Sequence, residues 1–234
     1  AMIHINGWNP VLFALSEDFI VDLSLLVGAI NTALAFTLFI CTAMIYACIK
    51  FLQEWATPLT VVNYTLLGMA SGFALSTAFA AYVESDLINF YGGWAITLTV
   101  FAFITRTASL IRNTKIKYKS NLSSAIGIRH TNIKQKAQGA MGGSFNTREY
   151  FHGAKPAFFK SIKWVFIVLV FVVPVGLLIA AITTNIFILF VLTFVVQFVG
   201  IIAVRWFFFV DAYHTTTLYF QTILHYFNHD GRSI

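Results

Sequence analysis

Charged residues are scarce in this 234-residue chain, at 10%, whereas apolar residues make up 59%. A soluble domain carries roughly a quarter charged and just under half apolar residues. A water-soluble monomer could not bury this much Leu, Ile, Val and Phe, so that class is excluded. Two cysteines and four prolines exclude a disulfide framework and a collagen, and 25 phenylalanines exclude a disordered chain. The composition indicates a membrane protein.

The two cysteines, Cys41 and Cys48, lie seven residues apart within one apolar run. This spacing places both thiols on one face of a helix. We expect them to be buried and reduced, rather than to form a disulfide or a metal site.

Uncharged stretches define the spans, because one bilayer crossing needs about 20 apolar residues in a helix. Three stretches, 23–49, 55–83 and 87–105, contain 27, 29 and 19 residues. The fourth, 164–204, contains 41 residues and fits two helices joined at Thr183-Thr184-Asn185. We expect Pro174 to kink the first of these two helices. The predicted fold is an all-α, polytopic transmembrane bundle with spans at 23–49, 59–83, 87–111, 164–183 and 186–210.

Positive charge is concentrated in one part of the chain. Residues 106–163 hold twelve Lys and Arg and one acid, whereas the rest holds three Lys and Arg and eight acids. Cytoplasmic loops carry the excess of Lys and Arg, so we expect this part on the cytoplasmic side of a bacterial inner membrane. The predicted segments are an outer N-terminal segment 1–22, three transmembrane helices 23–111, a basic cytoplasmic loop 112–163, a two-helix hairpin 164–210 and an interfacial tail 211–234.

Sequence motifs for phosphate, dinucleotide and zinc binding and for nucleophilic hydrolysis are absent, as is a C-x-x-C pair. None of the six histidines lies inside a predicted span, so we expect no bound haem. His214, His225 and His229 have spacings that suit one helix face, but tyrosine and water are more common partners than a metal. We predict no catalytic residue and no metal ligand in this chain.

Two arginines lie near predicted helix ends, Arg106 in the third helix and Arg205 in the fifth. One interpretation is that both side chains extend to the cytoplasmic interface. The other is that they hold an anionic or carbonyl group at the membrane edge.

A segment of the basic loop, 142–153, combines glycines, aromatic residues and charged residues. Long loops are usually functional or disordered, and the aromatic residues argue against disorder. A tethered connector with few stacking repeats also argues against nucleic acid as its partner. We predict a folded surface that docks a partner protein through Phe145, Arg148, Glu149, Tyr150, Phe151 and His152.

Several stretches together resemble the membrane anchor subunit of the dimethyl sulfoxide reductase family. One contains Glu54-Trp55-Ala56-Thr57-Pro58, and another is the docking segment itself. The similarity covers most of the chain after about residue 30. The matching stretches are 39–52, 54–60, 63–64, 68–72, 145–153, 160–164 and 205–209, with His214 and Tyr219.

This resemblance implies a non-haem anchor of a three-subunit molybdenum oxidoreductase. Such an anchor holds an iron–sulfur subunit and a molybdopterin catalytic subunit on the membrane and exchanges electrons with the quinone pool of the respiratory chain. The Trp-Ala-Thr-Pro segment is most similar to anchors of cytoplasmic sulfite-oxidising complexes. Family members usually have eight helices, so we expect the first three, which carry a His/Arg segment tied to quinol binding, to be missing here. The position before Arg205, often acidic in similar chains, is Val204.

Quinone chemistry moves two electrons and two protons, and needs an apolar slot, donors to carbonyl oxygens and a titratable group linked to water. The helix ends on the basic side supply such groups. A scaffold without a quinone role and a small-solute transporter remain alternatives, although no inverted repeat is visible. The predicted quinone-binding residues are Glu54, Trp55, Arg106, Arg205 and His214.

Overall fold

The computed structural model describes the chain except for residues 1–8, 17–18, 51, 118–126, 128–155 and 213–234. In the described part, five helical spans are long and apolar enough to cross a membrane. They are α2 (Leu23–Ala47), α3 (Pro58–Tyr82), α4 (Ile88–Thr114), the continuous run α6 (Pro156–Ile167), η2 (Val168–Val172) and α7 (Val173–Thr184), and α8 (Phe187–Val210). The predicted all-α transmembrane fold is confirmed, and the protein is a multi-pass membrane protein.

A small hairpin precedes the spans and was not predicted. Strands β1 (Val11–Ser16) and β2 (Phe19–Asp22) pair antiparallel, with Val11 opposite Asp22. Asp22 then caps α2, because its side chain accepts a hydrogen bond from the backbone N–H of Leu25 at 2.7 Å. Pairing in this hairpin depends on contacts between the two strands, which the distribution of apolar runs does not reveal.

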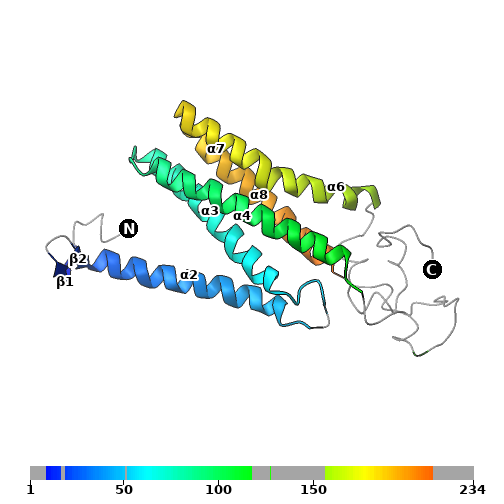
Figure 1. The fold of residues 1–234 in the computed structure, drawn as a ribbon. Coiled ribbons are helices and arrows are strands. Elements are labelled where there is room, and N and C mark those ends of the chain that lie inside the picture. Colours follow the sequence, from blue (N-terminus) through cyan, green and yellow to red (C-terminus); the bar gives the residue numbers. More distant parts are fainter. Residues whose placement is uncertain (1–8, 17–18, 51, 118–126, 128–155, 213–234) are drawn as a thin grey trace, which may run out of the picture.

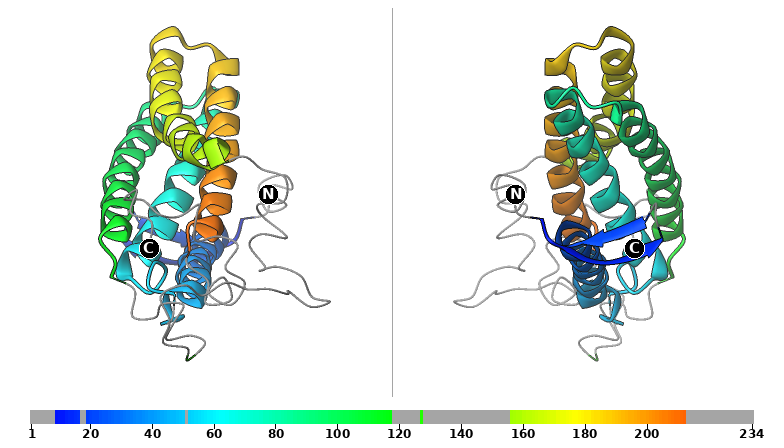
Figure 2. Two further views of the ribbon diagram at one scale, coloured as in Figure 1. Left: turned by 90° about the vertical axis from the view of Figure 1, so that its right-hand side faces the viewer. Right: turned by 90° about the vertical axis from the view of Figure 1, so that its left-hand side faces the viewer.

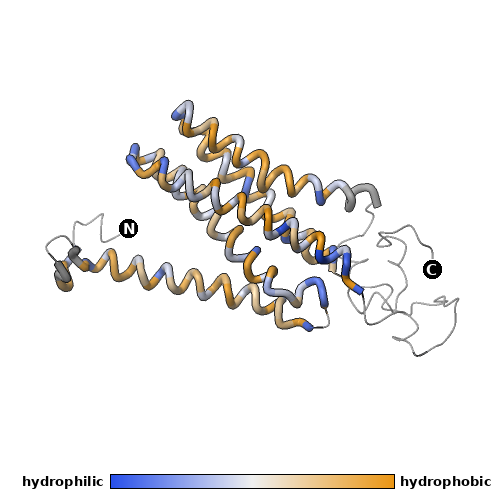
Figure 3. Tube along the Cα trace, in the orientation of Figure 1, coloured by the Kyte–Doolittle hydropathy of each residue, from blue (hydrophilic) through white to orange (hydrophobic). Residues whose placement is uncertain are grey.

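The helices run up and down, so two ends of the bundle can be defined. At the basic end, α2, α4 and α8 finish and α3 and α6 begin; α3–α4 and α7–α8 turn at the opposite end (Figure 1). Figure 3 shows mainly hydrophobic helices with hydrophilic residues gathered near the basic end of α3 and α4. The Thr183-Thr184-Asn185 turn is confirmed: Asn185 adopts a left-handed conformation with φ of 54° and ends α7.

Four of the spans form the core, and α2 diverges from them toward its N-terminus (Figure 1). Views along the bundle show α3, α4, α7 and α8 packed together (Figure 2). Small buried residues line the α3–α4 contact, which lets the backbones approach closely. They are Ala70, Ala74, Ala78, Ala95 and Ala102.

Cys41 and Cys48 lie on α2 or directly after it, and both are free thiols. The prediction that they are unpaired is confirmed, but the prediction that they are buried is wrong, because both are exposed. The reason is the position of α2, of which Ala43 is the buried residue. An apolar run does not distinguish a lipid-facing helix from a core helix, since both are hydrophobic.

The fourth span differs from its prediction at two places. Its helix begins at Pro156, eight residues before the expected start, because the uncharged stretch begins only after Lys163 and because Pro suits the first turn of a helix. Near the expected kink, residues 168–172 are π-helical, and the N–H of Val173 donates to the carbonyl of Val168. Pro174 follows directly and lacks an N–H, so the α-helical ladder is interrupted there.

Candidate functional site

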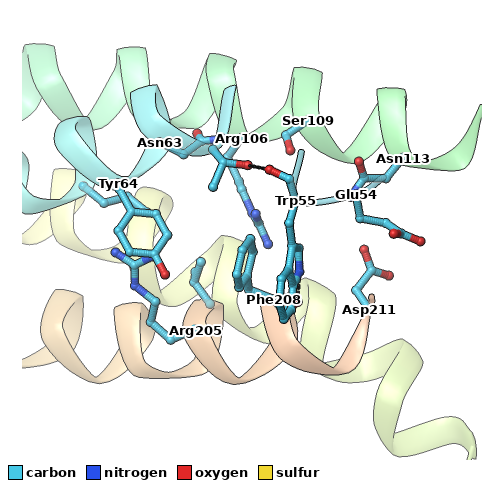
Figure 4. A pocket seen from close by; sticks show the side chains of 13 residues that line it. Glu54, Trp55, Asn63, Tyr64, Arg106, Ser109, Asn113, Arg205, Phe208 and Asp211 are labelled. Atoms are coloured by element: carbon cyan, nitrogen blue, oxygen red, sulfur yellow. Dashed lines mark hydrogen bonds between the residues drawn. The ribbon is translucent and has the colours of Figure 1, made fainter. Parts of the chain in front are cut away.

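A pocket lies at the basic end of the bundle, between α3, α4, α8 and the segment that joins α2 to α3 (Figure 4). Its lining comes from one helical face of each element, at spacings of three, four and seven residues. The lining residues are Glu54, Trp55, Thr60, Asn63, Tyr64, Leu67, Arg106, Ser109, Asn113, Val204, Arg205, Phe208 and Asp211.

Trp55 fixes the joining segment against the end of α8. Its indole N–H donates to the carbonyl of Phe208 at 3.0 Å, and its ring stacks on the Phe208 ring with centroids 4.9 Å apart. The hydroxyl of Thr60 donates to the Trp55 carbonyl at 2.8 Å, which holds the turn against the start of α3. Thr57 caps α3 and Pro58 opens it, so the local sequence favours a helix start at this point.

An aromatic cluster surrounds Trp55 and brings α2 to the same place. The Tyr46 ring from α2 packs edge-on against Trp55 and Phe208, with centroids 5.3 Å away in both cases. Tyr64 and Phe209 complete the group, at 5.8 and 5.6 Å from Tyr46. Edge-to-face aromatic pairs add about 0.5–1.5 kcal/mol each beyond the area that they bury. The cluster therefore gives one wall of the pocket a fixed shape.

Arg106 extends from α4 into the middle of the pocket (Figure 4). Its side chain is 6% exposed, and its Nε has no hydrogen-bond partner among the described residues. Its guanidinium lies 5.5 Å from the centroid of the Phe166 ring, a cation–π distance. A buried cation with an unused donor is costly in a membrane-spanning bundle and marks a candidate binding site.

Arg205 occupies the side of the pocket nearer the membrane interior. Its guanidinium carbon lies 3.2 Å from the centroid of the Tyr64 ring, so the two groups stack face to face. Figure 4 shows this pair beside the Arg106 side chain. The interpretation in which both arginines simply extend to the interface fits poorly for Arg106, which is buried.

Two carboxylates lie at the outer, basic side of the pocket. Figure 4 shows Glu54 and Asp211 facing each other there, with Asn113 beside them. Glu54 is 4% exposed, whereas Asp211 is only partly buried. With Arg106 and Arg205, the pocket holds two formal positive and two formal negative charges. It therefore has polar groups of both signs and no net charge.

Neutral polar side chains complete the lining. The amide oxygen of Asn63 accepts a hydrogen bond from the Thr105 hydroxyl at 2.9 Å, which joins α3 to α4. Ser109 and Asn113 follow Arg106 on the same face of α4, three and seven residues later. The free space at the centre is about 20 Å³. This is room for one water molecule, so a larger ligand needs side chains to move.

Four of the five predicted quinone-binding residues line this pocket together: Glu54, Trp55, Arg106 and Arg205. His214 lies outside the described residues. So does the predicted docking surface Phe145, Arg148, Glu149, Tyr150, Phe151 and His152. Their roles stay predictions.

Asp211, Tyr64 and Asn63 were missed by sequence reasoning. The available signal was spacing, because Thr60, Asn63 and Tyr64 on α3 repeat at the interval of a single helix face.

No family model matches this sequence, and no solved structure matches it. A membrane-complex protein of Allochromatium vinosum, named as a sulfite dehydrogenase subunit, is 47% identical over 220 residues. The match covers 94% of this chain and 68% of that protein. The wider resemblance to dimethyl sulfoxide reductase anchors stays a prediction. The chain belongs to the family of this sulfite dehydrogenase subunit.

Proposed function

We propose that this chain is the quinone-reactive membrane anchor of a sulfite-oxidising molybdenum complex. The observation that carries the proposal is the buried Arg106, whose unused Nε donor lies in a pocket at one end of the bundle. A relative named as a sulfite dehydrogenase subunit supports the reaction class. Oxidation of sulfite to sulfate with one water releases two electrons and two protons, which together reduce one quinone to its quinol.

The chemistry of the pocket suits a neutral ring with two carbonyl oxygens. Arg106 and Asn63 supply donors, and the Tyr64, Trp55 and Phe208 rings supply flat apolar surface. The zero net charge argues against a free phosphate or another strong anion. A ring enters only if aromatic side chains move, because the present space is about 20 Å³.

The partner subunits carry the other cofactors in this proposal. Two cysteines cannot supply the four thiolates of an iron–sulfur cluster, and both lie at α2. We therefore assign the clusters to a ferredoxin-type subunit and the molybdopterin to a catalytic subunit. Both dock at the basic end, through the 145–152 segment and next to the pocket. The Lys and Arg excess favours a cytoplasmic position for this end in a bacterial cell.

The test compares two electron acceptors in the purified complex. Replacing Arg106 with Gln removes the charge and the fork of donors, so we expect reduction of a short-chain quinone by sulfite to fall by about 10²-fold. Reduction of ferricyanide, which accepts electrons directly from the soluble subunits, should not change. The matched control is Lys115→Gln, because Lys115 is an exposed cation near the same end of α4.

The alternatives predict different results. A scaffold without a quinone role predicts that Arg106→Gln and wild-type complexes reduce quinone equally. A transporter predicts that the chain purifies without redox subunits. Equal quinone reduction in an intact complex would refute the proposed site.

A further inference from the structure

The pocket is polar toward the basic end and sealed toward the membrane interior. Its innermost polar pair is Asn63 with Thr105, and the next polar group on α4 facing the core is Thr99. Six residues of helix separate Thr105 from Thr99, which is about 9 Å. Buried apolar side chains fill this layer, namely Leu67, Ala102, Val170 and Val204.

Beyond that layer, Gln197 donates to the Thr99 hydroxyl at 3.1 Å. The small pocket around Gln197 has no room for a water molecule. A proton needs a chain of hydrogen-bonding groups or waters to move, so the described residues offer no route toward the opposite end.

The outer side of the pocket has the opposite character. Glu54 is buried beside the pocket, and Asp211 is partly exposed, so the two carboxylates lie in order between the pocket and the aqueous phase (Figure 4). Two carboxylates that face each other hold one proton between them more readily than two negative charges. The Arg106 cation, which interacts electrostatically with Asp211, favours the singly charged state of this pair.

We propose that Glu54 and Asp211 form a proton relay between the pocket and the aqueous phase at the basic end. This inference rests on the proposed function. In each turnover, the quinone accepts two electrons from the partner's iron–sulfur cluster and two protons through the pair, and it leaves as the quinol. Each proton lost by Glu54 to the quinone is replaced from Asp211, which takes one from water. Both protons therefore come from the side on which the partner subunits dock.

Other titratable and charged groups near the relay must be considered in its pH dependence. They come from every element around it: Tyr46 of α2, Tyr64 of α3, Arg106 and Arg112 of α4, Lys163 of α6 and Arg205 of α8. Arg112 donates to the carbonyl of Gln53 at 3.0 Å and so fixes the backbone next to Glu54. None of these groups is a carboxylate, which distinguishes the pair from its surroundings.

The experiment uses the whole complex with the variants Glu54→Gln and Asp211→Asn. We expect each to lower kcat for reduction of a short-chain quinone by at least tenfold, with little change in the KM for quinone. The solvent deuterium isotope effect on kcat should rise, because proton delivery becomes rate-limiting, and Asp211→Glu should retain activity. Ferricyanide reduction should be unchanged in all variants. The control is Glu84→Gln, an exposed carboxylate at the opposite end.

A second measurement tests the side of proton uptake. Complexes are reconstituted in vesicles with the basic end outward, and pH indicators are placed inside and outside. We expect proton uptake by the quinone site from the outer medium only.

Failure of the relay is distinguishable from failure of the proposed function. If Arg106→Gln lowers quinone reduction but both carboxylate variants keep the wild-type kcat and isotope effect, the relay is refuted alone. If all three variants reduce quinone normally, the site itself is refuted. Proton uptake from the inner volume would also overturn the relay.

Discussion

Gly200 is the position at which a single added methyl group should cost most in this bundle. A Cβ there would lie 2.7 Å from Val170 Cγ2, 2.9 Å from the backbone carbonyl carbon of Leu169 and 3.0 Å from its Cβ. Two of these atoms belong to or directly follow the backbone of the π-helical segment, so no change of rotamer relieves the contact. Gly200→Ala must therefore separate α8 from η2.

The magnitude follows from two opposing terms. Overpacking of a tight core costs about 1–3 kcal/mol. Replacing Gly by Ala within a helix returns up to about 1 kcal/mol of backbone entropy. We expect Gly200→Ala to be less stable than the wild type by about 1–2 kcal/mol.

The matched control is Gly176→Ala in α7, where an added Cβ meets nothing within 4 Å. Gly92→Ala is intermediate, because the nearest atom, at 2.8 Å, is the terminal Cδ1 of Ile182, a side chain that can rotate. The assay heats each purified variant in detergent and measures the fraction that stays monodisperse. We expect Gly200→Ala to lose its fold roughly 4–8 °C below Gly176→Ala. Equal melting of the two variants would show that the α8–η2 contact is looser than described.

Three further predictions concern the interior, the docking segment and the orientation. Gln197→Leu loses the hydrogen bond to Thr99, about 0.6 kcal/mol in membranes, but it also removes a buried amide oxygen with no described partner. We expect thermal stability in detergent to be unchanged or higher, and a drop of more than about 2 kcal/mol would contradict this reasoning. Replacing Arg148 and Tyr150 together with Ala should release the redox subunits into the soluble fraction of a cell lysate; full retention on the membrane would place docking elsewhere. In a background without native cysteines, Ser120→Cys should react with a membrane-impermeant maleimide only after cells are permeabilised, and labelling of intact cells would reverse the orientation.

The spans were predictable because their signal is simple. A stretch of 19 or more residues without a charge has few other interpretations, and the Thr183-Thr184-Asn185 turn interrupts the longest stretch with polar residues. The start of α6 was missed because Lys160 and Lys163 lie within its first two turns. Lysine at a helix end is compatible with a span, since its long side chain reaches the interface.

The site was predictable only where a residue is unusual for a membrane. Arg106 and Arg205 stand out as charges at helix ends, and Trp55 and Glu54 stand out in the resemblance. Asn63 and Tyr64 do not, because α3 is apolar on its lipid face as well as its core face and periodicity does not identify the inward side. Asp211 was assigned to the tail, one residue beyond the predicted span.

The π-helical segment has a consequence for the direction of one pocket wall. A π segment amounts to one residue more than an α-helix over the same turn, and each residue turns an α-helix by about 100°. The extra residue in Val168–Val172 therefore sets the angle at which α6 presents Phe166 to Arg106, independently of how α7 packs on α8. Deleting one residue there would restore a regular helix and rotate Phe166 away, while the turn at Asn185 stays in place. The span thus carries an adjustable joint, by which a single insertion or deletion could re-aim one half of it without rebuilding the other.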